Sequence, residues 1–137
     1  MKKILPIVLF ISVGFSQRLS EVIETYDNGN VKSITYHKKT RTGIEKVKYV
    51  EYYDNGQKMY EGYYNGLDKW GDPQLDGLYT GWYDNGQKRS YGTYNVGKKD
   101  GEWTYWYKNG QKMDEEIYKD GELITVKKWN KDESVNK

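Results

Sequence analysis

Four segments of the sequence repeat one short pattern: a tyrosine, one variable residue, then Asn, Gly and a polar residue. They are residues 26–30, 53–57, 83–87 and 107–111. The spacing between Gly29, Gly56, Gly86 and Gly110 is 27, 30 and 24 residues. A repeat of this length is typical of proteins that stack one supersecondary unit many times. The structure of this unit therefore determines the structural role that we predict for most other residues.

Each unit has the local chemistry of a β-hairpin. An Asn-Gly pair between two aromatic-rich runs favours a two-residue type I′ turn, because both residues tolerate a positive φ. The predicted turn pairs are Asn28-Gly29, Asn55-Gly56, Asn85-Gly86 and Asn109-Gly110. A two-residue turn in the last unit would place Tyr107 opposite Lys112 and Trp106 opposite Met113, with Tyr105 opposite Asp114.

The shortest spacing indicates the basic unit, since residues 76–83 align without gaps on residues 100–107. The longer spacings then require insertions, which fit at residues 37–45 and 67–74. Gly, Pro and charged residues interrupt the alternating pattern there, so both segments are predicted to be enlarged loops at one end of the stack.

Alternation along the strands predicts which side chains share a face. One face should carry Tyr49, Tyr79 and Trp103, and the other should carry Tyr52, Trp82 and Trp106. Residues 118–126 add a further turn signal and an alternating strand, and we expect them to close the stack. The predicted fold is therefore all-β: an elongated single-layer antiparallel sheet of tandem hairpins.

The first 16 residues have the features of a secretory signal peptide. Lys2 and Lys3 precede a hydrophobic stretch that is too short to span a membrane, and small residues precede a cleavage site after Ser16. We expect signal peptide 1–16, repeat domain 17–129 and polar tail 130–137, with no membrane span in the mature chain. The predicted location is the periplasm or the cell exterior.

Composition excludes several classes of function. The formal net charge is +2 over 137 residues, and losing Lys2 and Lys3 leaves a balanced chain, unlike most nucleic-acid-binding proteins. The sequence contains no cysteine, so neither disulfides nor thiolate metal sites can form. Burial must depend heavily on the 15 tyrosines and five tryptophans.

The inventory of reactive side chains does not favour an enzyme. His37 is the only histidine, and no cysteine can complete a common zinc or nucleophile set. Asp27, Asp54 and Asp84 recur once per unit before the Asn-Gly pair, which favours a role in turn formation. Asp68, Asp72 and Asp76 do not have the spacing of a calcium loop. We therefore expect no catalytic residue, no metal and no cofactor.

Surplus aromatic residues favour a binding function. Tyr52, Trp82 and Trp106 are predicted to form a ladder across neighbouring hairpins, and Trp70 lies in the longest insertion. Such a ladder can bind a partner protein or a glycan, although the same rings can also pack structurally. A protein partner is the first expectation and a glycan the second. Edge strands at the first and last hairpins could also mediate self-association.

Residues 101–112, followed by Tyr118 and Gly121, resemble the bacterial variant of the MORN repeat. Many bacterial proteins with this repeat are described as antitoxin components of the YwqK type. The resemblance implies an elongated sheet of hairpins that acts as a scaffold for protein contacts or, in some members, for membrane lipids. It adds a toxin-neutralising protein to the alternatives, next to a carbohydrate-binding surface protein. The predicted export signal departs from the cytosolic setting of an antitoxin.

Overall fold

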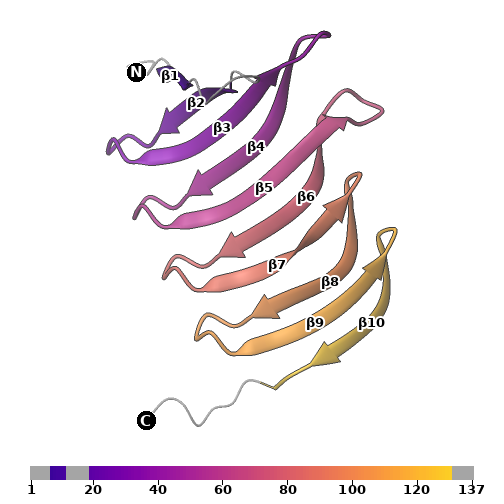
Figure 1. Ribbon diagram of the computed structural model, residues 1–137. Helices are drawn as coiled ribbons and strands as arrows, with labels where there is room; N and C mark the ends of the chain where they lie inside the picture. The colour runs from indigo at the N-terminus through magenta and orange to yellow at the C-terminus, as the bar shows by residue number, and fades with distance from the viewer. Residues whose placement is uncertain (1–6, 12–18, 131–137) are drawn as a thin grey trace.

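The computed structural model describes residues 7–11 and 19–130, which form ten β-strands and no helix. The strands pair antiparallel, each with its neighbours in the sequence, in a single sheet of order β1 to β10 (Figure 1). Their bounds are β1 Ile7–Ile11, β2 Leu19–Thr25, β3 Val31–Lys39, β4 Ile44–Tyr52, β5 Lys58–Leu67, β6 Pro73–Trp82, β7 Lys88–Asn95, β8 Lys98–Trp106, β9 Lys112–Lys119 and β10 Glu122–Lys128.

The strands follow one another as curved arcs in one open layer (Figure 1). The four Asn-Gly turns lie at one end of the strands, and the β3–β4, β5–β6, β7–β8 and β9–β10 connections lie at the opposite end. We call these the Asn-Gly end and the far end. The predicted fold class, an elongated single-layer antiparallel sheet of tandem hairpins, is confirmed.

Strand β1 lies inside the segment predicted to be a signal peptide, and it pairs with β2 from Ile7 opposite Ile23 to Ile11 opposite Leu19. The predicted cleavage site after Ser16 lies outside the described residues, as do residues 131–137 of the predicted tail. If the leader is removed, β2 becomes the first strand of the sheet.

The Asn-Gly turns differ from the predicted type I′ geometry. Only the glycine of each pair has a positive φ, as at Gly110 with 86°, whereas type I′ requires it at both residues. The Gly110 amide donates to the Tyr107 carbonyl, and the Tyr107 amide donates to the Gln111 backbone carbonyl. This is a three-residue loop, in which a type I turn is followed by a left-handed glycine. The same two bonds recur in all four turns.

The three-residue loop shifts the pairing next to the turn. Trp106 lies opposite Lys112 and not opposite Met113 as predicted, while Tyr105 lies opposite Asp114 as predicted. A β-bulge restores the predicted register between these two pairs. Equivalent bulges occur beside the other three Asn-Gly turns, so the predicted faces are preserved along the strands.

Type I′ turns do occur, but at the far end. Val96 and Gly97 both have a positive φ (48° and 77°), and so do Asp120 and Gly121 (52° and 88°). Asn95 lies opposite Lys98 across the first of these turns, and Lys119 lies opposite Glu122 across the second. The second turn leads into β10, so the predicted terminal strand is present.

The two insertions lengthen strands and do not form enlarged loops as predicted. Strand pairing continues to Lys39 opposite Ile44 and to Leu67 opposite Pro73, which leaves only residues 40–43 and 68–72 as connections. Gly and charged residues do not end pairing here, because both faces of the sheet are open to solvent at the far end and alternation is not required.

One face of the sheet supplies the main core. We call it the aromatic face, because it carries Tyr49, Tyr79 and Trp103, which lie in one row with the glycines of the intervening strands. Tyr49 lies opposite Gly62, and Tyr79 lies opposite both Gly62 and Gly92. A Cβ atom at Gly92 would overlap the Trp103 ring, so the missing side chain lets this ring lie against the backbone. Trp103 is only 2% exposed.

Six rings of the aromatic face form a continuous chain of contacts, with centroid separations from 5.0 to 6.2 Å. They belong to Tyr49, Tyr60, Tyr79, Tyr94, Trp103 and Tyr105. The indole nitrogen of Trp103 donates to the Thr93 carbonyl at 3.0 Å, which satisfies its one polar atom. A single layer can therefore bury large side chains by packing them against one another.

Candidate functional site

Neighbouring repeats are joined at the Asn-Gly end by side chains of the turn itself. The hydroxyl of Tyr53 donates to the Trp82 carbonyl, and that of Tyr83 donates to the Trp106 carbonyl, both at 2.9 Å. Tyr26 makes the equivalent bond to the Tyr52 carbonyl at 2.7 Å. The turn tyrosines of the first three units thus each bond to the end of a strand in the next unit.

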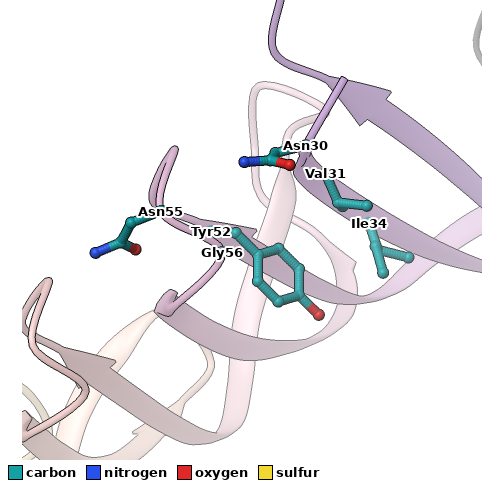
Figure 2. Close-up of a pocket in the computed structure, with 6 residues that line it drawn as sticks. All are labelled: Asn30, Val31, Ile34, Tyr52, Asn55 and Gly56. Atoms are coloured by element: carbon teal, nitrogen blue, oxygen red, sulfur yellow. The ribbon is translucent and has the colours of Figure 1, made fainter. Parts of the chain in front are cut away.

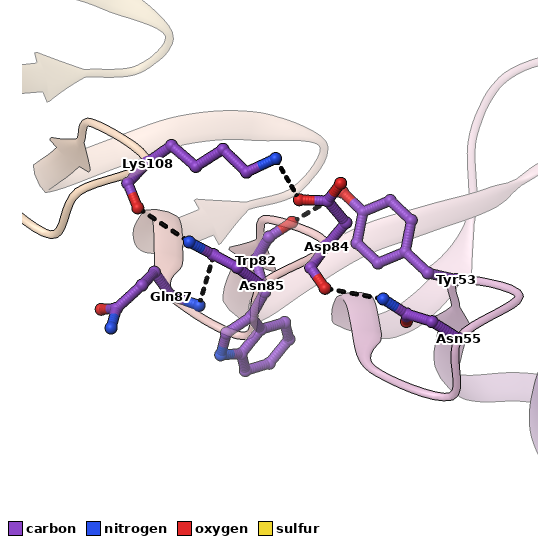
Figure 3. Close-up of polar contacts among 7 residues, drawn as sticks. All are labelled: Tyr53, Asn55, Trp82, Asp84, Asn85, Gln87 and Lys108. Atoms are coloured by element: carbon purple, nitrogen blue, oxygen red, sulfur yellow. Dashed lines mark hydrogen bonds and ion pairs between the residues drawn. The ribbon is translucent and has the colours of Figure 1, made fainter.

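The turn asparagines have two roles, which Figure 3 shows for Asn85. Its Oδ1 accepts from the Gln87 amide at 3.1 Å within the turn, and its Nδ2 donates to the Lys108 carbonyl of the next turn at 2.9 Å. Asn55 makes both types of bond in the preceding repeat. The hydrogen bond from Lys108 holds the pKa of the Asp84 carboxyl below its ordinary value. Hydrogen bonds between successive turns therefore join the repeats along the Asn-Gly end.

Three members of the predicted aromatic ladder lie on the opposite face of the sheet, which we call the mixed face. It is defined by Val50, Thr80 and Thr104, two residues before Tyr52, Trp82 and Trp106. Among the described residues, no ring contact joins these three aromatic side chains to one another. Lys58 lies over the Trp82 ring instead, with its Nζ 5.5 Å from the centroid. The predicted ladder is thus interrupted by lysine.

Lysines on the mixed face pair with carboxylates from the same sheet. Glu61 accepts from Lys48 at 2.8 Å and from Lys58 at 2.7 Å. Partial burial would raise the pKa of Glu61, but these two hydrogen bonds and charges outweigh it and lower the pKa. Lys112 pairs with Glu115 at the equivalent spacing in the last repeat. The recurring lysine after Asn-Gly-Gln is the sequence signal for these pairs, and the aromatic-ladder prediction did not use it.

Tyr52 lines an open depression at the Asn-Gly end, with a volume of about 340 Å³ (Figure 2). Ile34 and Val31 supply its apolar wall, and Asn30 and Asn55 supply amide groups from two successive turns. The Asn30 amide group already donates to the Asp54 carbonyl at 2.7 Å. The depression therefore combines an apolar wall with amide groups that also form the hydrogen bonds between successive turns.

Trp70 lies apart from the other predicted binding residues, in the turn between β5 and β6 at the far end. Its side chain is 75% exposed. The Asp68 carboxylate accepts from the Trp70 amide at 2.8 Å and from the Asp72 amide at 3.0 Å, which fixes the turn. Gly71 has a φ of 91°, so this turn has the same form as the Asn-Gly turns, with Trp70 in place of Asn.

A second open depression, of about 490 Å³, lies between Trp70 and the neighbouring β7–β8 turn. Its lining residues combine aromatic, apolar and polar groups from two successive hairpins. They are Tyr64, Asp68, Trp70, Pro73, Gln74, Leu75, Val96, Gly97 and Lys98. The two hairpins are tied together here, because the Gly97 amide donates to the Leu75 carbonyl at 2.7 Å. The far end thus presents an exposed tryptophan beside a recess with fixed walls.

Two lysines on the aromatic face are surrounded by rings. The Lys99 Nζ lies 4.6 Å from the Trp103 centroid and 2.5 Å from the Tyr105 hydroxyl. The Lys46 Nζ lies 4.2 Å from the centroids of both Tyr49 and Tyr64, and burial lowers the pKa of Lys46. Sequence reasoning missed both lysines, because alternation alone does not show which charge is covered by aromatic neighbours.

The described residues contain no group of three or more His, Asp or Glu side chains that could hold a metal ion. His37 lies in β3, where partial burial and the charge of Lys46 lower its pKa. The Asp68 carboxylate accepts hydrogen bonds from the amides of its own turn.

Comparison with protein families adds a decisive observation to this geometry. The family described as "MORN repeat variant" matches residues 42–65, 75–95 and 99–120. The chain carries three MORN-variant repeats. Each match covers one Asn-Gly turn together with strand residues on both sides of it. The first Asn-Gly unit, residues 26–30, lies outside the matched segments.

MORN repeats generally take part in protein or membrane interactions, and scaffolds of this type are generally noncatalytic. A comparison of the whole chain with curated proteins found no match. Within the described residues there is no helix long and apolar enough to cross a membrane.

Proposed function

We propose that this MORN-variant protein is an exported, noncatalytic interaction module that binds a protein partner through its far end. The observation that carries the proposal is Trp70, a large aromatic side chain that is displayed on a hydrogen-bonded turn and left exposed. Tryptophans that sit next to a recess are frequent energetic centres of protein interfaces. The turn is already ordered by Asp68, so binding would require little further loss of conformational freedom.

The distribution of the other aromatic side chains supports this choice. The rings of the aromatic face bury one another, and Trp103 in particular is a core residue. Trp82 is covered in part by Lys58. Trp70 has no ring contact among the described residues. Lys69, on the same exposed turn, lies over a Trp70 ring with its Nζ 4.2 Å from the centroid, and Trp70 nevertheless stays 75% exposed.

Export is part of the proposal and is supported by the charged start, apolar stretch and small residues of the first 16 positions. An exported chain would meet its partner in the periplasm or outside the cell. A toxin-neutralising role is one form of such protein binding, and it would require a toxin that acts in the same compartment.

A glycan is the second candidate ligand, because Gln74, Asp68 and Lys98 place polar groups around the Trp70 and Tyr64 rings. Stacking on an aromatic ring together with a polar rim would suit a sugar. Retention on insoluble polysaccharide that is lost in Trp70→Ala would favour this candidate over a protein.

Site-specific photocrosslinking in the intact cell envelope tests the proposal. A photoreactive phenylalanine at position 70 is expected to crosslink one defined protein, which mass spectrometry would identify. The same residue at Asn109, an exposed position in a turn at the opposite end, is the matched control and should not crosslink that protein. Equal crosslinking from both positions, or none from position 70, would refute a partner site at the far end.

A further inference from the structure

Strand β10 is the last strand of the open sheet, and nothing in the described chain pairs with its outer edge. All seven of its residues are exposed. Three of them are large and apolar, namely Leu123, Ile124 and Val126. An exposed apolar edge strand is a template for pairing with another strand, because its outward amide and carbonyl groups lack partners.

The charges of β10 are distributed unequally along the strand. Glu122 is its first residue, and Lys127 and Lys128 are its last. Antiparallel pairing of β10 with an identical strand brings the first residue of each copy to the last residues of the other. Such a pairing would therefore join opposite charges at both of its ends, whereas parallel pairing would join like charges.

We propose that β10 pairs antiparallel with β10 of a second copy, which forms a symmetric dimer with a continuous sheet. This inference goes beyond the proposed function, since its partner is the same chain and its surface is the last strand. A twofold axis between Ile124 and Thr125 places Glu122 opposite Lys127 of the second copy. It also places Leu123 opposite Val126 of the second copy.

The faces of the strand agree with this register. Leu123 pairs with Tyr118 and Val126 pairs with Glu116, and both of these β9 residues lie on the aromatic face. Glu122 and Lys127 pair with Lys119 and Glu115, so they lie on the mixed face. The dimer would thus extend the apolar row of one face and form two ion pairs on the other, without exchanging the faces.

The bulge between Leu123 and Thr125 limits the strength of the pairing. Ile124 is the extra residue of β10 relative to β9, and bulges in edge strands increase twist and shorten the paired region. An interface of one short strand per copy buries less than a standard protein interface. We therefore expect a dimer with a Kd of about 1 to 100 µM, in the range of weak specific complexes.

Sedimentation velocity of the chain in the form that the cell produces tests the proposal. The wild-type protein should change from monomer to dimer as its concentration rises through the micromolar range. Glu122→Lys and Lys127→Glu should each weaken the dimer by about tenfold or more, because each creates two like-charged pairs across the twofold axis. The double variant E122K/K127E should restore the wild-type Kd, because it exchanges the two charges.

Lys69→Glu is the matched control, since it makes the same change of charge at an exposed turn far from β10 and should leave the Kd unchanged. Circular dichroism of each variant checks that the sheet is retained. A wild-type chain that stays monomeric at about 1 mM, well above the expected Kd, would overturn the proposal. A double variant that fails to recover the dimer would do the same, and so would single variants with an unaltered Kd.

Discussion

At the scale of single residues, Gly92 determines how closely Trp103 can lie against the sheet. The ring occupies the space that a side chain at position 92 would need, and the neighbouring aromatic residues prevent the ring from moving away. A methyl group at this position must therefore displace the most deeply buried large side chain of the protein.

Gly92→Ala should lower the free energy of unfolding by about 1 to 3 kcal/mol, the usual cost of overpacking a core. Gly62→Ala is the matched control, because the added methyl group meets the tip of Leu75 at 3.0 Å, and this flexible side chain can adjust. Urea unfolding followed by tryptophan fluorescence measures both variants. Equal stability of the two variants would show that Trp103 does not depend on Gly92.

A second residue-scale prediction concerns pH. The pKa of Glu61 in the folded protein lies below its ordinary value of 4.5, so ionised Glu61 favours the folded state. This contribution is complete above that ordinary value and is lost as the pH falls through the lower folded pKa. Its size is about 1 kcal/mol or less, because Lys48 and Lys58 are partly exposed and solvent screens the pairs.

Glu61→Gln should therefore destabilise the protein at pH 7, and the difference from wild type should shrink as the pH falls below about 4.5. Thermal unfolding at a series of pH values gives the comparison. Glu102→Gln, which removes one negative charge at an exposed position of the mixed face, is the control. A difference between Glu61→Gln and wild type that is constant from pH 7 to pH 3 would contradict the assignment.

At the scale of strands and turns, two kinds of connection recur in the described part of the chain. The Asn-Gly turns have three-residue loops, in which a backbone carbonyl accepts from the asparagine of the preceding repeat, and the far end contains tighter type I′ turns. Val96 occupies one of these turns at a φ of 48°, which is unfavourable for a β-branched side chain. Asp120 occupies the equivalent position in the last hairpin.

Val96→Asn should raise the free energy of unfolding by about 1 kcal/mol, because asparagine tolerates a left-handed conformation and Val96 is 60% exposed. Asp120→Asn should change stability far less, since aspartate already tolerates the same conformation. Differential scanning calorimetry of the two variants separates the effects. A Val96→Asn variant that is less stable than wild type would show that the valine side chain contributes packing at this turn.

The sequence predicted the tandem hairpins and their faces correctly because the repeat supplied the same signal several times, but it placed loops where the two insertions extend the strands. Alternation of Tyr79 and Trp103 with their neighbours was enough to assign the aromatic face. The turn type could not be predicted, because Asn-Gly is compatible with both a two-residue and a three-residue loop. The bond between successive turns does not decide the form, because the last turn has the same three-residue loop while the Asn109 Nδ2 donates to Gln111 in its own turn.

At the scale of the whole molecule, the sheet has a single layer. Aromatic residues must therefore both form its core and, in our proposal, bind its partner. Aromatic side chains build the core on one face, and at least one aromatic side chain, Trp70, remains exposed at the far end. Sequence reasoning grouped Trp70 with Tyr52, Trp82 and Trp106. It could not separate them, because the position of an insertion relative to the ends of the strands depends on the completed hairpins.

One paired experiment tests whether Trp70 binds the partner while Trp103 stabilises the fold. Partner capture from the cell envelope and thermal unfolding are measured for Trp70→Ala and Trp103→Ala. Trp70→Ala should abolish capture while changing stability by less than about 0.5 kcal/mol, as is usual for an exposed position. Trp103→Ala should lower stability by about 3 to 5 kcal/mol. Undiminished capture by Trp70→Ala, or an unchanged stability of Trp103→Ala, would contradict the account.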